Sequence, residues 1–165
     1  LLVAPVGTEL PATVNDAWRD GWETIGYIHE DGLTVDVDSE SEELFAWQSK
    51  TPLRSIVTGK TMTVEFTMLE ITPKATALFF DEDVPTGTDA AFTLNVSSDG
   101  KAKEYAVAID TLDGGSILTY VFPRATLSEN GDIEIESAEF QGYPITLKAL
   151  DDAGTLCVIT RGAAA

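Results

Sequence analysis

The chain has 165 residues, enough for one domain with a hydrophobic core of its own. Asp and Glu number 28 against 10 Lys and Arg, which gives a formal net charge of -18. Tight binding of nucleic acid needs basic residues that displace counterions from phosphates, so this charge argues against a nucleic-acid reader. A surface that DNA passes without sticking is compatible with it. No stretch approaches the roughly 20 apolar residues of a membrane span, and no membrane association is expected.

Residues 1–21 are predicted to be an N-terminal arm, because they contain Pro and Gly and show little periodicity. Trp18 and Trp22 stand near its end. Aromatic residues in an irregular segment indicate that the arm docks on something. Its own domain and a neighbouring subunit are both open as docking partners.

The pattern becomes that of β-strands from residue 25 onward. An Asp-Gly pair at Asp31 and Gly32 predicts a hairpin turn. The next strand alternates, with Leu33 and Val35 on one face and Asp36 and Asp38 on the other. Residues 39–52 break the alternation and predict a long loop, a feature that tends to be functional. This loop carries a candidate partner surface, formed by Glu42, Glu43, Leu44, Phe45, Trp47 and Gln48.

Two further strands, at 53–58 and 61–70, are predicted on either side of Gly59 and Lys60. In the second strand, Thr63, Glu65 and Thr67 alternate with apolar residues. A short helix follows near 73–80, because Thr72 is a favoured N-cap and Pro73 suits the first helical position. We expect this helix to stop before the acidic residues 81–83 and to lie on the sheet through Ala75, Leu78 and Phe79.

Short strands separated by turn signals fill the rest of the chain, at 91–96, 104–110, 117–122, 132–136, 140–150 and 156–160. The predicted fold is mainly β, an antiparallel β-sandwich or barrel with one short flanking helix near 73–80 and a long loop at 39–52. Residues 22–160 form its single domain, and residues 161–165 read as a C-terminal tail.

We find no pattern that indicates catalysis, a cofactor or a metal. The chain has one histidine, His29, and one cysteine, Cys157. Nucleophilic triads need a histidine base in a suitable setting, and zinc sites need three or four suitable ligands. The acidic run at 36–43 lacks the glycine that an EF-hand loop requires at its sixth position. We therefore expect a protein that is not an enzyme.

An ordered series of motifs resembles the major tail tube protein of long, non-contractile-tailed (siphovirus-type) bacteriophages, especially those that infect actinobacteria. The motifs are GYIHEDG at 26–32, AWQ at 46–48, LRSIVT at 53–58, TVEFTMLE at 63–70, VFPRA at 121–125 and YPITL at 143–147. The resemblance covers residues 22–160 and rests on the whole series, since no single motif is diagnostic.

This resemblance implies a structural virion protein, assembled in the host cytoplasm, whose subunits form hexameric rings that stack into the tail tube. The implied partners are further copies of the chain, the tape measure protein, and the tail terminator and tail-tip proteins. DNA passes through the lumen without specific binding. The loop at 39–52 would contact a neighbouring ring. We expect Asp36, Asp38, Thr63, Glu65 and Thr67 to line the lumen, although their faces could equally point outward.

Three other interpretations remain. A monomeric immunoglobulin-like binding or adhesion module is compatible with the strand count. A contractile-tail tube or a type VI secretion tube subunit could share the fold. An enzyme is the third class.

Overall fold

The structure is a computed structural model that describes residues 1–11, 13–16, 18, 20–135 and 141–164. It is mainly β with one short helix, as predicted. The elements are β1 (Leu2–Pro5), β2 (Glu23–Thr24), β3 (Ile28–Leu44), β4 (Arg54–Met68), α1 (Pro73–Phe80), β5 (Gly87–Thr88), β6 (Ala91–Phe92), β7 (Glu104–Asp113), β8 (Ser116–Asn130), β9 (Tyr143–Ala149) and β10 (Val158–Ala163).

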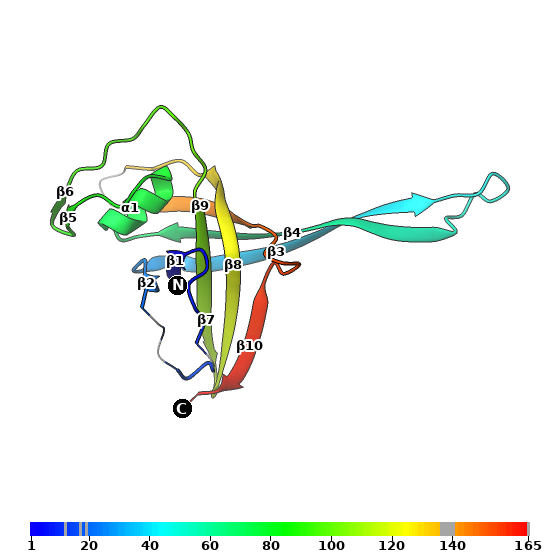
Figure 1. Cartoon of the computed structure of the whole chain (residues 1–165), viewed down its shortest axis with the longest axis horizontal. Helices are drawn as coiled ribbons and strands as arrows, with labels where there is room; N and C mark the ends of the chain where they lie inside the picture. Colours follow the sequence, from blue (N-terminus) through cyan, green and yellow to red (C-terminus); the bar gives the residue numbers. More distant parts are fainter. Residues whose placement is uncertain (12, 17, 19, 136–140, 165) are drawn as a thin grey trace.

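Eight of these strands form one antiparallel sheet that bends around β8. The order is β2-β1-β7-β8-β9-β4-β3, and β10 also pairs with β8. Residues 116–121 of β8 pair with β10, whereas residues 125–130 pair with β9. In Figure 1, β7, β8 and β10 run down the page while β3 and β4 cross it. The sheet is open and does not close into a barrel, and β3 lies at its edge.

Two predicted breaks in the strands are bulges instead. The Asp31-Gly32 pair makes no hairpin turn but lies inside β3, where the register with β4 shifts between Ile28 and Leu33. Gly32 has a φ of 78° there, a left-handed value that glycine adopts without strain. The strands predicted at 53–58 and 61–70 are a single strand, β4.

Pro123 likewise does not end its strand, since β8 continues through it to Asn130. The register with β7 shifts at this point, because Val107 pairs with Phe122 and Tyr105 with Ala125. Proline has no N–H to donate to a neighbouring strand, and a bulge is one of the places in a sheet where it is tolerated.

The loop predicted at 39–52 is shorter than expected. Residues 39–44 continue β3 and pair with β4, so only residues 45–53 connect the two strands. β4 pairs with β9 only from Thr63 onward, so on the other side of the Asp36–Thr63 pair the hairpin of β3 and β4 has no further strand beside it. There it projects out of the body of the molecule (Figure 1). We call residues 38–60 the hairpin arm and residues 44–54 its tip.

Helix α1 has the ends that the sequence predicts. The hydroxyl oxygen of Thr72 accepts a hydrogen bond from the backbone N–H of Ala75 at 3.1 Å. The helix ends at Phe80, and Asp81 follows it in the left-handed conformation. Ala75, Leu78 and Phe79 are buried against the sheet, as predicted, together with the large core residues Phe122, Met68, Ile109, Ile145 and Leu147.

The remaining strand boundaries differ from the prediction. The strand predicted at 91–96 is only the two-residue β6, which pairs with β5. Residues 131–135 form no strand, and β9 begins at Tyr143. Glu136 and Phe140, at the ends of two predicted strands, lie outside the described residues. The sheet also reaches into both terminal segments, through β1 in the arm and through β10 as far as Ala163 in the tail; Ala165 is not among the described residues.

Candidate functional site

The five residues predicted to line a lumen lie together on one face of the sheet. Asp36 of β3 pairs with Thr63 of β4, and Thr63 pairs in turn with Lys148 of β9. Glu65 and Thr67 occupy the alternate positions further along β4, so they share this face. Asp36, Asp38 and Glu65 are exposed. We call this surface, with its three acids and one lysine, the polar face.

The opposite face of the same three strands is the core. Val64, Phe66, Ile145 and Leu147 are at most 3% exposed. Successive side chains of a strand point to opposite faces, so the alternation read from the sequence is a true two-sided surface.

The hairpin arm carries the second group of predicted residues. Glu42, Glu43 and Leu44 lie on β3, where Glu42 pairs with Ile56 and Glu43 with Ser55. Phe45, Trp47 and Gln48 lie in the connection, which the backbone N–H of Leu53 closes by donating to Leu44 at 2.8 Å. The side chain of Trp47 is 100% exposed and that of Phe45 is 58% exposed.

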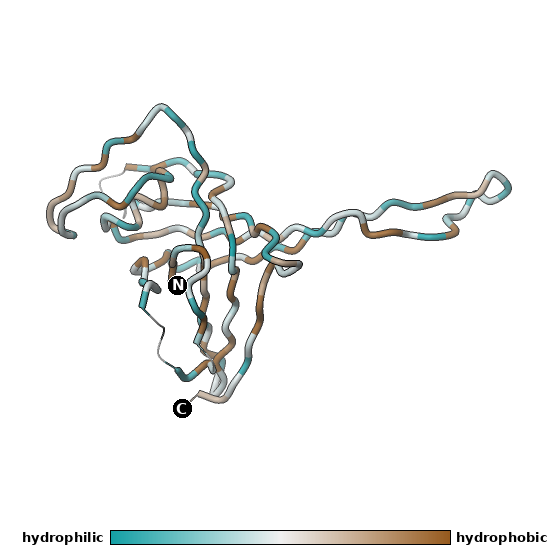
Figure 2. The backbone as a smooth tube through the Cα atoms, in the orientation of Figure 1, coloured by the Kyte–Doolittle hydropathy of each residue, from teal (hydrophilic) through white to brown (hydrophobic). Residues whose placement is uncertain are grey.

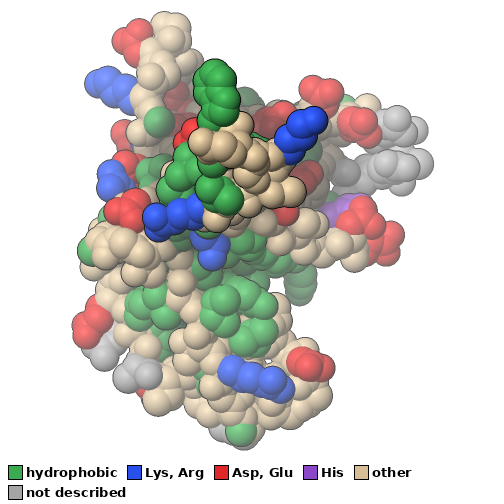
Figure 3. Space-filling model, turned by 90° about the vertical axis from the view of Figure 1, so that its right-hand side faces the viewer, with side chains coloured by type: hydrophobic (Ala, Val, Ile, Leu, Met, Phe, Trp, Pro, Cys, Tyr) green, Lys and Arg blue, Asp and Glu red, His purple; other side chains and the backbone are tan. Residues whose placement is uncertain are grey.

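Sequence reasoning missed three apolar residues of the arm. Leu53, Ile56 and Val57 are exposed, although they belong to an apolar stretch. The sequence did contain a signal for this exposure. Ile56 and Val57 are adjacent in a strand, so their side chains point to opposite faces, and only one of them can pack on a core that covers a single face. Figure 2 shows hydrophobic segments along the projecting hairpin, and Figure 3 shows hydrophobic and basic side chains gathered where the arm points at the viewer.

Both tryptophans of the N-terminal arm pack on the chain's own domain. Trp22 is 7% exposed and lies in a cluster with Ala4, Ala106 and Val121. Trp18 Nε1 donates to Asp110 Oδ2 at 2.8 Å, and the two indole rings are 4.9 Å apart. The Asp110 carboxylate also accepts from the buried Thr119 hydroxyl at 2.6 Å.

The acidic residues after α1 anchor the helix end to β7. The Asp81 carboxylate accepts from the Tyr105 hydroxyl and from the Lys103 backbone N–H, each at 3.0 Å. Burial first, and then the Asp81 hydrogen bond, raise the pKa of Tyr105 well above its ordinary value. Asp83 pairs with Lys103 Nζ at 2.6 Å, which lowers the pKa of that carboxyl.

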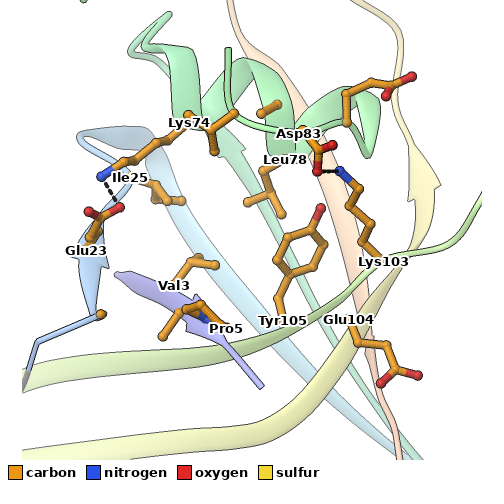
Figure 4. Close-up of a pocket in the computed structure, with 15 residues that line it drawn as sticks. Val3, Pro5, Glu23, Ile25, Lys74, Leu78, Asp83, Lys103, Glu104 and Tyr105 are labelled. Carbon is orange, nitrogen blue, oxygen red and sulfur yellow. Dashed lines mark hydrogen bonds and ion pairs between the residues drawn. The ribbon is translucent and has the colours of Figure 1, made fainter. Parts of the chain in front are cut away.

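Beside this anchor lies a pocket of about 460 Å³, between β1 and α1. Its floor is apolar, and charged side chains surround it (Figure 4). Sequence reasoning missed it because its walls come from segments that are far apart in the chain. We call it the β1–α1 pocket.

The part of the chain that the structure describes contains neither a metal-binding cluster nor a membrane-spanning helix. There, no group of three His, Cys, Asp or Glu side chains is placed to hold a metal ion. No helix of the described residues has the length and hydrophobicity needed to cross a membrane.

A bent, open β-sheet with one polar face, one packed face and a projecting apolar hairpin has the features of a structural building block. The sequence profile of the phage tail tube protein family matches residues 1–159, and the chain belongs to this family. Its members are structural components of the phage tail, so this is a virion protein. A search among curated proteins gave no match.

Proposed function

We propose that copies of this chain close into hexameric rings that stack to form the tube of a long, non-contractile phage tail. The observation that carries the proposal is the long edge strand β3, whose outer edge has no partner among the described strands. Such an edge tends to pair with another chain, and closure into a ring removes it.

The charges on β3 favour a ring over a two-fold dimer. Asp36, Asp38, Glu40, Glu42 and Glu43 are all exposed on this strand. Two copies of β3 placed edge to edge would bring these acids together, and like charges opposite one another destabilise a strand pair. The edge must therefore meet a different surface, and such head-to-tail contacts generate rings or helical filaments.

The polar face supplies a lumen wall in this arrangement. Asp36, Asp38 and Glu65 would repel DNA phosphates, so that the genome slides past without binding. The tape measure protein would occupy the lumen during assembly in the host cytoplasm, and the tail terminator and tail-tip proteins would bound the tube. The hairpin arm, through Phe45 and Trp47, would contact a neighbouring ring.

Electron microscopy of negatively stained protein, with light scattering across a concentration series, tests the proposal. Rings or hollow tubes with six subunits per turn are the expected result. Tubes with a different number of subunits per ring would contradict the proposed hexamer but would support the proposed tube. A chain that stays monomeric even with tail-tip and tape measure proteins present would contradict the proposal and favour a monomeric binding module.

A further inference from the structure

The β1–α1 pocket is apolar at its base. Val3 approaches from β1, Ile25 from the segment just after β2, Leu78 from α1, and the Tyr105 ring from β7 (Figure 4). Its volume of about 460 Å³ is within the range of pockets that take up a large organic group. An exposed apolar hollow of this kind favours the binding of an apolar partner.

The rim of the pocket is acidic. Its charged residues are Lys74, Lys103, Glu23, Glu82, Asp83 and Glu104. Lys74 pairs with Glu23 and Lys103 with Asp83, so both lysines are already neutralised. Arg124, which is not among the residues lining the pocket, pairs in turn with Glu104 at 2.7 Å. The rim therefore keeps an excess of one negative charge, that of Glu82, and a partner with basic groups beside an apolar one would fit it.

The tip of the hairpin arm has this chemistry. Residues 44–54 contain two cations, Lys50 and Arg54, and no acid, in a chain whose net charge is -18. Neither cation forms an ion pair with any described residue. Next to them stand the exposed rings of Phe45 and Trp47. A buried aromatic ring of this size removes about 150–250 Å² from water and dominates the energetics of many interfaces.

We propose that the hairpin tip of one copy docks in the β1–α1 pocket of another copy, with Trp47 or Phe45 in the hollow and Lys50 and Arg54 at the acidic rim. The contact is between copies because the arm projects away from the side of the molecule that carries α1, β1 and β2 (Figure 1). The proposal rests on the self-assembly described under Proposed function and names the surface that receives the arm.

Site-specific photo-crosslinking on the full chain tests this contact. A benzophenone amino acid replaces Trp47, which is 100% exposed, so the subunit is expected to fold; circular dichroism checks this. Protein labelled with ¹⁵N is mixed with unlabelled protein before assembly, and crosslinked peptides are mapped by mass spectrometry. We expect mixed-isotope crosslinks from position 47 to residues 74–84 or 103–105.

A matched control places the same amino acid at Leu112, which is 72% exposed and lies at the far end of β7. Its crosslinks should not reach residues 74–84. If position 47 does not tolerate the probe, Phe45 takes its place, since it is also exposed.

The outcomes separate this proposal from the proposed function. Assembled particles in which position 47 crosslinks elsewhere, or not at all, would overturn the docking site and leave the tube intact. Crosslinks to the pocket that are exclusively single-isotope, with no mixed-isotope pairs, would show that the arm folds back on its own chain, which also overturns it. If no assembly forms under any condition, the proposed function fails and the docking site fails with it.

Discussion

Asp81 joins the end of α1 to β7 and to the residue just before it through one carboxylate. It caps the end of α1 in a left-handed conformation with φ of 54°, and it accepts hydrogen bonds from the Tyr105 hydroxyl and the Lys103 backbone. Asp is among the few residues other than Gly that adopt this conformation at modest cost. The position therefore needs both the conformational tolerance and the acceptor oxygens of Asp.

Replacing Tyr105 with Phe removes the hydroxyl and leaves one Asp81 oxygen without its donor. We expect the free energy of unfolding to fall by about 1.5–3 kcal/mol, the range for a hydrogen bond to a charged group. The pKa of Tyr105 is raised above its ordinary 10.0. The contribution is therefore present below pH 10 and is lost as the pH rises above it. Urea unfolding measures both effects, and the exposed Tyr27→Phe is the control; equal loss in the two variants would contradict the prediction.

Glu82 holds the segment after α1 through Ser97. The backbone N–H and the hydroxyl of Ser97 both donate to Glu82 Oε1 at 2.6 Å, and these hydrogen bonds lower the pKa of Glu82 below its ordinary 4.5. A lowered pKa contributes stability above pH 4.5 that is lost as the pH falls.

Glu82→Ala should therefore be less stable than the wild type near neutral pH, and the difference should shrink in acid. Urea unfolding at about pH 7 and about pH 3 checks this pH dependence. Asp89→Ala, a change at an exposed acid on the same segment, should have no such effect. A difference that persists unchanged at the lower pH would show that the carboxylate is not responsible.

At the level of elements, the hairpin arm is held mainly by its own strand pairing. The arm lies outside the part of the sheet that packs on the core, because β9 does not pair with it. Its large apolar side chains are exposed to solvent. Exposed apolar side chains cost little in the isolated subunit, yet they can supply much of the energy of an interface.

The double variant Phe45→Ala, Trp47→Ala should fold like the wild type, with a change in unfolding free energy within about 0.5 kcal/mol. Its assembly should be lost or strongly reduced, because the aromatic anchors of the arm are gone. Electron microscopy and light scattering measure assembly, and Leu112→Ala serves as an exposed apolar control. Normal tubes from the double variant would refute the anchor role.

Local sequence signals predicted the bounds of α1 correctly, but they predicted the ends of several strands wrongly. Thr72 and Pro73 act through capping and a fixed φ, which need no information from the rest of the chain. Asp31-Gly32 and Pro123 carry turn signals too, but pairing with β4 and β7 extends the strands past them. A long neighbouring strand absorbs the irregular residue as a bulge, and only the partner's position reveals this.

At the scale of the whole molecule, the sequence predicted five residues of the polar face, but it did not predict which residues on other strands lie beside them. Alternation predicted that Asp36 and Thr63 each point away from a packed face. It could not show that they are paired, or that Lys148 lies beside them, because that depends on strand order. The β1–α1 pocket was out of reach for the same reason.

The prediction that the polar face lines the lumen can be tested by measuring which reagents reach a cysteine placed on that face. In a Cys157→Ser background, Thr63→Cys should react with both a small maleimide and one attached to a bulky polymer in the free subunit. In assembled tubes, only the small reagent should react, because the lumen excludes the polymer. Labelling is read by mass spectrometry, and full reaction of tubes with the bulky reagent would place this face on the outer wall.

The pairing of β1 with β7 has a consequence for folding during synthesis on the ribosome, because the two strands are far apart in the chain. Val3 emerges first, but its partner Val107 follows about a hundred residues later. Translation at about 5–20 residues per second separates the two by roughly 5–20 s. Until then β1 has only the two-residue strand β2 to pair with. Val3 and Tyr105 are both walls of the β1–α1 pocket. If the hairpin tip docks in this pocket as proposed, a nascent chain would display its hairpin arm before its own pocket is complete, and an unfinished subunit would not accept a neighbour there.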